Sequence, residues 1–218
     1  MKKILILTAC ALVAFGCSKT EVVKNTAPVN NAPANTAANT SVVKEETYTS
    51  GANPRADLIS ATQKLQKLTF WSAKITSETM PETNAELQFV APDRYRIIKS
   101  DDEVIVIGDV SYSKKDGKWR VLEDNIGEFI REQTRSGMEE GVRNLQNVEV
   151  VGKDKVNGKA ATVYSHKFGD ITTKVWIGTE SGLQLKNEVE ANIGGTIQKQ
   201  TTIYDYDKPV TIEAPKIN

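Results

Sequence analysis

The feature that most constrains the fold is an alternation of apolar and polar residues that runs, with one long break, from residue 70 to near the end of the chain. Trp71, Ala73 and Ile75 are separated by polar residues, and the same period recurs in "AELQF", while "EVIVIGD" and "TKVWIGT" read as further strands. A period of two is typical of β-strands that bury one face. Turn sequences such as "KDGK", "VNGK" and "ESG" follow the strands closely, which favours antiparallel hairpins over parallel crossovers. The sequence therefore predicts one large antiparallel sheet in meander order, with "VTIEA" (residues 210–214) as its last strand.

Two segments depart from this pattern and predict helices. In "NPRADLISATQKLQKL" (residues 53–68), Asn53 is a candidate N-cap, Pro54 is in the first turn and leucines recur at helical spacing. "DNIGEFIREQTRSGMEEGVRNL", from Asp124 to Leu145, reads as one or two amphipathic helices interrupted by glycines. A sheet of about ten or eleven strands curls through its own twist. We therefore expect an α+β fold in which these helices cover the concave face of a curved sheet.

The N-terminus has the three parts of a secretion signal, because Lys2 and Lys3 precede the apolar run "ILILTACALVAF" and the small residue Gly16. The run is shorter than the roughly 20 residues that span a bilayer, so we expect residues 1–16 to be removed. The ending "AFGC" resembles the bacterial lipobox, in which the cysteine is acylated and becomes the first mature residue. This predicts lipidation of Cys17; the alternative is an ordinary signal with an incidental cysteine. Cys10 leaves with the signal, so the mature chain has no intramolecular disulfide.

The segment after Cys17 is poor in aromatic residues and rich in Asn, Ala, Thr and Pro. Such a composition cannot bury enough apolar surface to offset the entropy of ordering. We therefore expect residues 17–53 to form a lipidated, disordered tether and residues 54–218 to form one folded domain.

The charges and motifs exclude several classes of function. Removing Lys2 and Lys3 leaves 26 basic against 28 acidic side chains, so nothing in the net charge recruits nucleic acid. The single histidine, His166, lies in a predicted strand, and no metal site can be built from it. "NIGGT" lacks the lysine of a phosphate-binding loop and reads as a hairpin turn. We therefore expect neither an enzyme nor a metal cofactor.

The remaining candidates for function are aromatic and apolar side chains on the strands and the second helical segment. One interpretation is that they pack a core beneath the helices; the other is that some line a cavity for an acyl chain. Alternation indicates that one set of positions faces inwards, but it does not say which set. The candidates for the wall and cover of such a cavity are Trp71, Leu87, Phe89, Tyr95, Ile97, Val106, Tyr112, Phe129, Ile130 and Trp176.

The order of the strand sequences also resembles a known family. "FVAPDRYRI" is followed by "VIVIGDVSYSKKDGKWRV", a helical insert, "VNGKAATVYSH", "KVWIGTESGLQLKNEVE" and "TTIYDYDKPVTIEAP". From Leu58 to Pro215 this resembles the LolA/LolB-type lipoprotein carriers, and more closely the outer-membrane lipoprotein-sorting and LprG-type lipid-transfer lipoproteins. The resemblance implies a half-barrel of about eleven antiparallel strands, with helices plugging the open side around a hydrophobic pocket. It implies no catalytic residue, and no cofactor besides the acyl lipid on Cys17.

Two functions from different classes remain at this point. The first is binding and transfer of lipids or lipoprotein acyl chains by a membrane-anchored monomer; the second is an envelope interaction or stress-sensor module that has filled its pocket with side chains. The expected partners are the membrane, an acyl-chain ligand and, for the second function, another envelope protein. Residue 18 is a serine and not the acidic residue that is associated with retention in the inner membrane. This favours an outer-membrane lipoprotein that faces the periplasm, or the outer face of the plasma membrane in an organism with one membrane.

Overall fold

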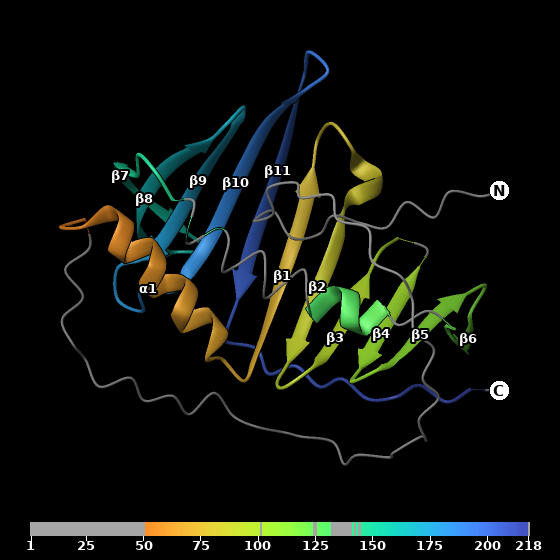
Figure 1. Ribbon diagram of the computed structural model, residues 1–218. Helices are drawn as coiled ribbons and strands as arrows, with labels where there is room; N and C mark the ends of the chain where they lie inside the picture. Colours follow the sequence, from red (N-terminus) through yellow and green to blue (C-terminus); the bar gives the residue numbers. More distant parts are fainter. Residues whose placement is uncertain are drawn as a thin grey trace.

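The structure is a computed structural model that describes residues 51–100, 102–123, 126–131, 141, 143 and 145–217. Its main element is one open, strongly curved antiparallel sheet of 11 strands in the order β6-β5-β4-β3-β2-β1-β11-β10-β9-β8-β7 (Figure 1). The predicted α+β fold with a single curved antiparallel sheet is confirmed. The strands are β1 (Phe70–Ser77), β2 (Ala85–Val90), β3 (Arg94–Ile98), β4 (Glu103–Ile107), β5 (Val110–Lys115), β6 (Lys118–Val121), β7 (Glu149–Val156), β8 (Lys159–Phe168), β9 (Ile171–Gly178), β10 (Gln184–Ile193) and β11 (Thr196–Asp205).

The sheet consists of two meanders rather than one. Strands β1 to β6 run outwards to one edge, whereas β7 begins at the opposite edge and the chain returns to β11, which pairs with β1. The segment between β6 and β7 is the predicted helical insert. Of that insert, residues 126–131, 141 and 143 are helical in the described part, and Gly137 and Met138 lie outside the described residues.

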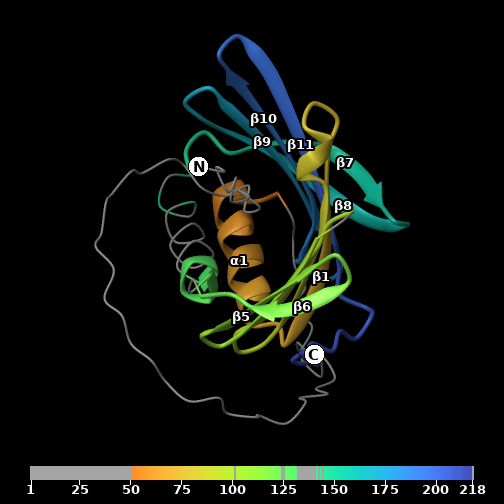
Figure 2. The ribbon, with the colours of Figure 1, turned by 90° about the vertical axis from the view of Figure 1, so that its right-hand side faces the viewer.

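Helix α1 (Pro54–Gln66) lies on the concave side of the sheet (Figure 2). The side chain of Asn53 accepts a hydrogen bond of 3.1 Å from the backbone N–H of Ala56, which confirms the predicted N-cap. Beneath the helix, the hydroxyl of Tyr164 donates a 2.8 Å hydrogen bond to Asp57. This contact and the burial of Leu58 and Ala61 against β8 and β9 attach α1 to that half of the sheet.

The predicted last strand, residues 210–214, is wrong. The chain after Asp205 has no regular secondary structure up to residue 217, and it crosses the outer, convex face of β3–β5 instead. Val210 and Ile212 pack there against Phe70, Val90 and Ile105. The physical reason is that β11, the strand that precedes this segment, already pairs with β1 and β10. Neither of its edges can accept another strand, so Val210 and Ile212 are buried by packing instead.

A 3-10 turn, η1 (Pro81–Thr83), joins β1 to β2. No helix in the described part of the chain is long and apolar enough to cross a membrane.

Candidate ligand-binding face

The two faces of the sheet follow from the strand register, since residues directly opposite each other in antiparallel strands point to the same side. One ladder runs from Ile75 through Thr202, Asn187 and Val175 to Tyr164. Because Tyr164 is bonded to α1, this ladder identifies the concave face. Alternation along each strand then assigns every other position.

Charge is completely segregated between the two faces across β1–β4 and β8–β11. On the concave face these strands carry no Lys, Arg, Asp or Glu, and His166 is their one histidine there. A face without charges that lies open to water would be unfavourable, so it is built to be covered by protein or by an apolar ligand. The charged residues of these strands lie on the convex face: Lys74, Glu86, Arg94, Arg96, Glu103, Lys159, Lys167, Lys174, Lys186, Glu188, Glu190, Lys199 and Asp205.

Six of the candidates from the sequence lie together on the concave face. Their register forms two adjacent ladders, in which Leu87 is opposite Ile97 and Phe89 is opposite Tyr95. The structure thus selects odd-numbered positions in β1–β3 as the inward set, a choice that alternation alone left open. The six residues are Trp71, Leu87, Phe89, Tyr95, Ile97 and Val106.

Aromatic rings form a continuous row across this face. The ring centroids of Tyr95 and Phe89 are 5.1 Å apart, those of Phe89 and Trp71 5.5 Å, and those of Trp71 and Tyr204 5.9 Å. Tyr206 stacks on Tyr204 at 6.0 Å. These separations are in the range of favourable aromatic pairs, so the row is a continuous aromatic surface that extends from β11 to β3.

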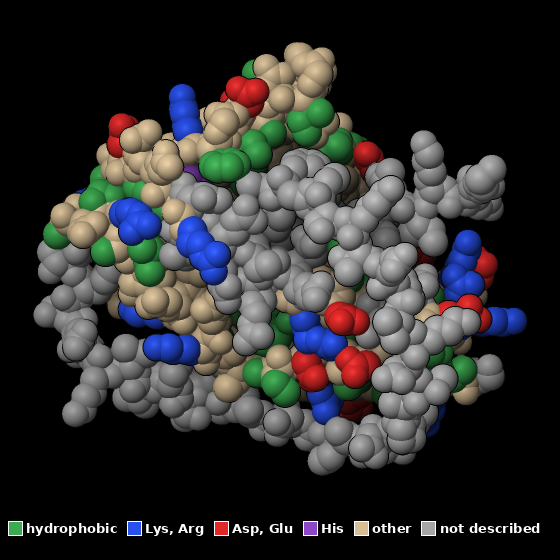
Figure 3. All heavy atoms as spheres, in the orientation of Figure 1, with side chains coloured by type: hydrophobic (Ala, Val, Ile, Leu, Met, Phe, Trp, Pro, Cys, Tyr) green, Lys and Arg blue, Asp and Glu red, His purple; other side chains and the backbone are tan. Residues whose placement is uncertain are grey.

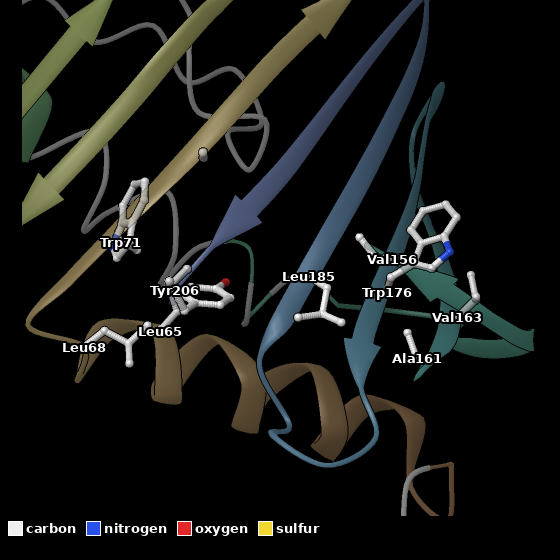
Figure 4. Packing of buried hydrophobic residues seen from close by; sticks show 10 residues of the cluster. Leu65, Leu68, Trp71, Val156, Ala161, Val163, Trp176, Leu185 and Tyr206 are labelled. Carbon is white, nitrogen blue, oxygen red and sulfur yellow. The ribbon is translucent and has the colours of Figure 1, made fainter. Parts of the chain in front are cut away.

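The row begins beside helix α1. Figure 4 shows Tyr206 above the helix next to Leu65, with Trp71 further along β1. The Tyr206 hydroxyl donates a hydrogen bond to the backbone carbonyl of Gln184, and burial raises its pKa well above the usual value. Tyr206 therefore remains protonated and joins the end of the row to β10.

A second cover lies over the other end of the row, where the helical segment 126–131 meets the β4–β5 turn. A Cβ on Gly127 would lie 2.5 Å from the carbonyl oxygen of Gly108, so only glycine allows this close approach. Arg131 donates a 2.6 Å hydrogen bond to that same carbonyl and forms a 2.6 Å ion pair with Asp109. In this segment Ile130 is half-buried, whereas Phe129 remains 44% exposed.

Figure 3 shows the side of the molecule that carries α1. Hydrophobic side chains gather at the upper ends of β9–β11, and charged side chains gather over the helical segment 126–131. Ile193, at the end of β10, is among the exposed hydrophobic residues on the concave side of this rim.

Two sequence candidates, Tyr112 and Trp176, lie on the convex face and do not join the other six. Tyr112 packs against Ile105 and Ile212 under the C-terminal segment. Trp176 lies beside Val156 and Val163 (Figure 4), and its indole N–H donates a 2.9 Å hydrogen bond to Asp154. The reason is the strand register. Each of these two aromatic residues lies two positions from a lysine on its own strand, and residues two positions apart point to the same face.

That parity is also the signal that could have separated the candidates. Lys174 stands two residues before Trp176, and Lys114 stands two residues after Tyr112, so each aromatic shares a face with a lysine. Leu87 and Phe89 occupy the opposite parity to Glu86. The same rule identifies Tyr204, a member of the aromatic row that the sequence analysis did not include.

Two titratable groups of this half of the sheet have shifted pKa values. Burial lowers the pKa of His166 on the concave face, which favours the neutral imidazole. On the convex face the hydrogen bond from Trp176, followed by that from the backbone N–H of Lys155, lowers the pKa of Asp154. Among the described residues, His, Cys, Asp and Glu nowhere form a group of three that could hold a metal ion.

Comparison with protein-family models and with curated protein sequences finds no match. Two solved structures share the fold. The lipoprotein LppX of Mycobacterium tuberculosis is 14% identical, with a TM-score of 0.58 over 73% of this chain and 98% of that chain. LprF from Mycobacterium bovis is also 14% identical, with a TM-score of 0.57 over 74% of this chain and 96% of that chain. At the level of the fold, the chain therefore has the LolA-like half-barrel architecture of LppX and LprF, as its sequence resemblance indicated.

Proposed function

We propose that this protein is a membrane-anchored envelope lipoprotein that binds the acyl part of a lipid or lipoprotein against the concave face of its half-barrel. The observation that carries the proposal is the segregation of charge, because β1–β4 and β8–β11 place all their Lys, Arg, Asp and Glu on the convex face. The aromatic row from Tyr204 to Tyr95 provides the contact surface for an acyl chain. Binding of this kind is not catalytic.

The position of the core in the β1–β6 half supports the same function. There a buried cluster lies on the convex side, where Phe70, Val90 and Ile105 pack under Ile212. This half therefore has a core on its convex side in addition to the residues buried on its concave face, such as Val106. Leu87 and Phe89 are correspondingly only partly buried, which suits residues that contact a ligand.

The decisive experiment measures bound lipid and then blocks the concave face. The mature polypeptide from residue 17, carrying Cys17→Ser so that no acyl chain is attached, is purified without detergent and examined by native mass spectrometry for co-purified lipid. Binding of the neutral dye 1-N-phenylnaphthylamine is then measured in Leu87→Glu. A carboxylate buried beside a hydrocarbon ligand is costly, so we expect at least a roughly tenfold loss of dye affinity.

The matched control is Gln88→Glu on the same strand. Gln88 points to the convex face, where its amide donates a hydrogen bond to Glu86 and it lies opposite Arg96. The new carboxylate loses the bond to Glu86 but stays on the face away from the dye, so dye binding should be unchanged. Both variants are checked by circular dichroism. A wild-type protein that neither carries lipid nor binds the dye would contradict the proposal and would favour an interaction or sensor module.

The anchor is a separate part of the proposal and rests on Cys17 in "AFGC". A single acyl chain binds a membrane only marginally, at about 0.8 kcal/mol for each buried CH₂, whereas several chains anchor it firmly. Cys17→Ala should therefore leave an uncleaved or soluble chain, which fractionation and intact-mass measurement would detect. A mutant that is cleaved and still bound to membranes would exclude lipidation at this residue. Transfer of the bound lipid between membranes and a location in the outer membrane are further parts of the proposal.

A further inference from the structure

The concave face carries a polar pair on β10 and β11 next to the aromatic row. Between the apolar positions Val175 and Ile75, the ladder across β9, β10, β11 and β1 contains Asn187 and Thr202. Asn187 is directly opposite Thr202, which makes it a diagonal neighbour of Tyr204 at about 7–8 Å. The polar position is therefore contiguous with the end of the aromatic row.

Two buried side-chain atoms at this place have no hydrogen-bond partner among the described residues. They are the Oδ1 oxygen of Asn187, whose residue is 3% exposed, and the Nε2 nitrogen of Gln184, whose residue is 6% exposed. Gln184 precedes Asn187 on β10, and its register partner Ile177 lies on the concave face. A buried polar atom without a partner costs free energy and is rare in native proteins, so a group that supplies the missing bonds would be bound there.

The missing bonds define the chemistry of that group. An amide oxygen needs a donor and an amide nitrogen needs an acceptor. A hydroxyl can serve as either, and an ester or amide carbonyl can accept. A lipid head group with hydroxyls and an ester therefore meets both requirements.

The strands around Asn187 favour an uncharged group, because the inward-facing lysines and arginines of the sheet lie on β5, β6 and β7. The concave face of β1–β4 and β8–β11 carries no Lys or Arg to neutralise a phosphate or carboxylate. An anion buried here would lack a counter-charge, which is very costly in an apolar environment. His166, on the same face, lies in the ladder next to that of Asn187 and does not supply a fixed positive charge.

We propose that Asn187 and Gln184 bind the uncharged, hydroxyl-bearing end of the lipid while its acyl chain lies along the aromatic row. The ligand class is a neutral glycerolipid of the monoacylglycerol type, and not a phospholipid or a free fatty-acid anion. This inference rests on the proposed function, because it assigns a head-group position to the same acyl-binding face.

The test uses three probes with the same oleoyl chain, each displacing 1-N-phenylnaphthylamine from the unacylated mature polypeptide. They are 1-oleoylglycerol, methyl oleate, which has no hydroxyl, and 1-oleoyl-glycerol-3-phosphate, which is anionic. We expect 1-oleoylglycerol to bind roughly tenfold more tightly than methyl oleate. The phosphate should bind more than about a hundredfold more weakly than 1-oleoylglycerol.

Variants then assign this preference to β10. In Asn187→Leu, which keeps the approximate size of the side chain, the preference for 1-oleoylglycerol over methyl oleate should fall to within about twofold, with methyl oleate affinity retained. Gln184→Met should reduce the preference in the same direction and guards against a folding defect in the first variant. Glu190→Leu is the control, since Glu190 is on the same strand but on the convex face, and the preference should be unchanged.

The outcomes separate the two proposals. If the dye and the lipids bind but wild type shows no hydroxyl preference, or Asn187→Leu and Gln184→Met retain it, the head-group position is wrong while acyl binding stands. Tight binding of the phosphate would also overturn it. If wild type binds neither the dye nor any of the three lipids, acyl binding itself is wrong and the head-group position fails with it.

Discussion

The two halves of the sheet are covered by different segments on opposite faces. In the β8–β11 half, α1 lies on the concave face, where Tyr164 and Ile177 are fully buried. In the β1–β6 half, the C-terminal segment lies on the convex face, where Ile212 packs against Phe70 and Val90. One curved sheet is therefore covered on the inside by α1 at one end and on the outside by the C-terminal segment at the other, while each half also buries residues on its second face, such as Trp176 and Val106.

This difference shows how a curved sheet can be stable and still have an apolar inner surface for a ligand. The half that uses α1 packs a helix in the place where a ligand would otherwise bind. The other half gains a core on its outer face, and Leu87 and Phe89 stay only partly buried on the charge-free inner face. The difference between the halves can be tested residue by residue.

The largest expected effect is on the inner face beneath α1. Ile177→Ala removes a fully buried side chain and should lower the free energy of unfolding by about 2–5 kcal/mol. Leu87→Ala, on the same face of the other half, should cost less than about 1.5 kcal/mol, because Leu87 is only partly buried. Urea denaturation at pH 7 measures both. Equal losses would show that the inner face of β1–β4 is an ordinary packed core.

Much of the fold could be predicted from the sequence because its signals are local. Alternation and short turns indicated the antiparallel sheet, and Asn53 with Pro54 marked the start of α1. The position of the C-terminal segment could not be predicted in the same way. "VTIEA" has the alternation of a strand, but whether it pairs or packs depends on which sheet edges are free, and that is a property of the complete topology.

The candidate site was predictable in part for a related reason. Alternation grouped Leu87 with Phe89 and Tyr95 with Ile97, but the inward parity depends on where the cover lies. Tyr112 and Trp176 were included because aromatic residues on strands look alike until the charges of their neighbours are compared. The unpartnered atoms of Asn187 and Gln184 could not be recognised from sequence, since a missing hydrogen bond is visible only in three dimensions.

The second prediction tests the outer core of the β1–β6 half. Ile212→Ala should destabilise the protein by about 2–4 kcal/mol, because Ile212 is almost fully buried. The affinity for 1-N-phenylnaphthylamine should not change, since Ile212 lies on the face away from the aromatic row. Stability and dye binding are measured on the same samples. A loss of dye affinity with the fold intact would show that the two faces are not independent.

A smaller effect is expected from the second cover of the inner face. Gly127→Ala places a Cβ 2.5 Å from the Gly108 carbonyl oxygen and 2.9 Å from Val106, so the helical segment 126–131 must move away from β4 and β5. We expect a loss of about 1–3 kcal/mol and a change in dye affinity, measured by urea denaturation and titration. Arg131→Lys is a milder comparison that keeps the charge but loses the two-point contact with Gly108 and Asp109. Unchanged stability and dye binding in Gly127→Ala would mean that this close approach has no role.

The smallest expected difference is the response of the α1-covered half to acid. Burial lowers the pKa of His166 below its ordinary value of about 6.5, so at mildly acidic pH the unfolded chain binds more protons than the folded one. Stability from this group is then complete above about pH 6.5 and is lost as the pH falls below that value, until the folded pKa is passed. The strands of the inner face offer no carboxylate, and Asp57 of α1 on the same side already accepts hydrogen bonds from Tyr164 and the backbone N–H of Gly51. Urea midpoints at pH 7.5 and 5.5 should therefore differ more for wild type than for His166→Gln, whereas a larger difference in the variant would show that protonated His166 gains a partner on folding.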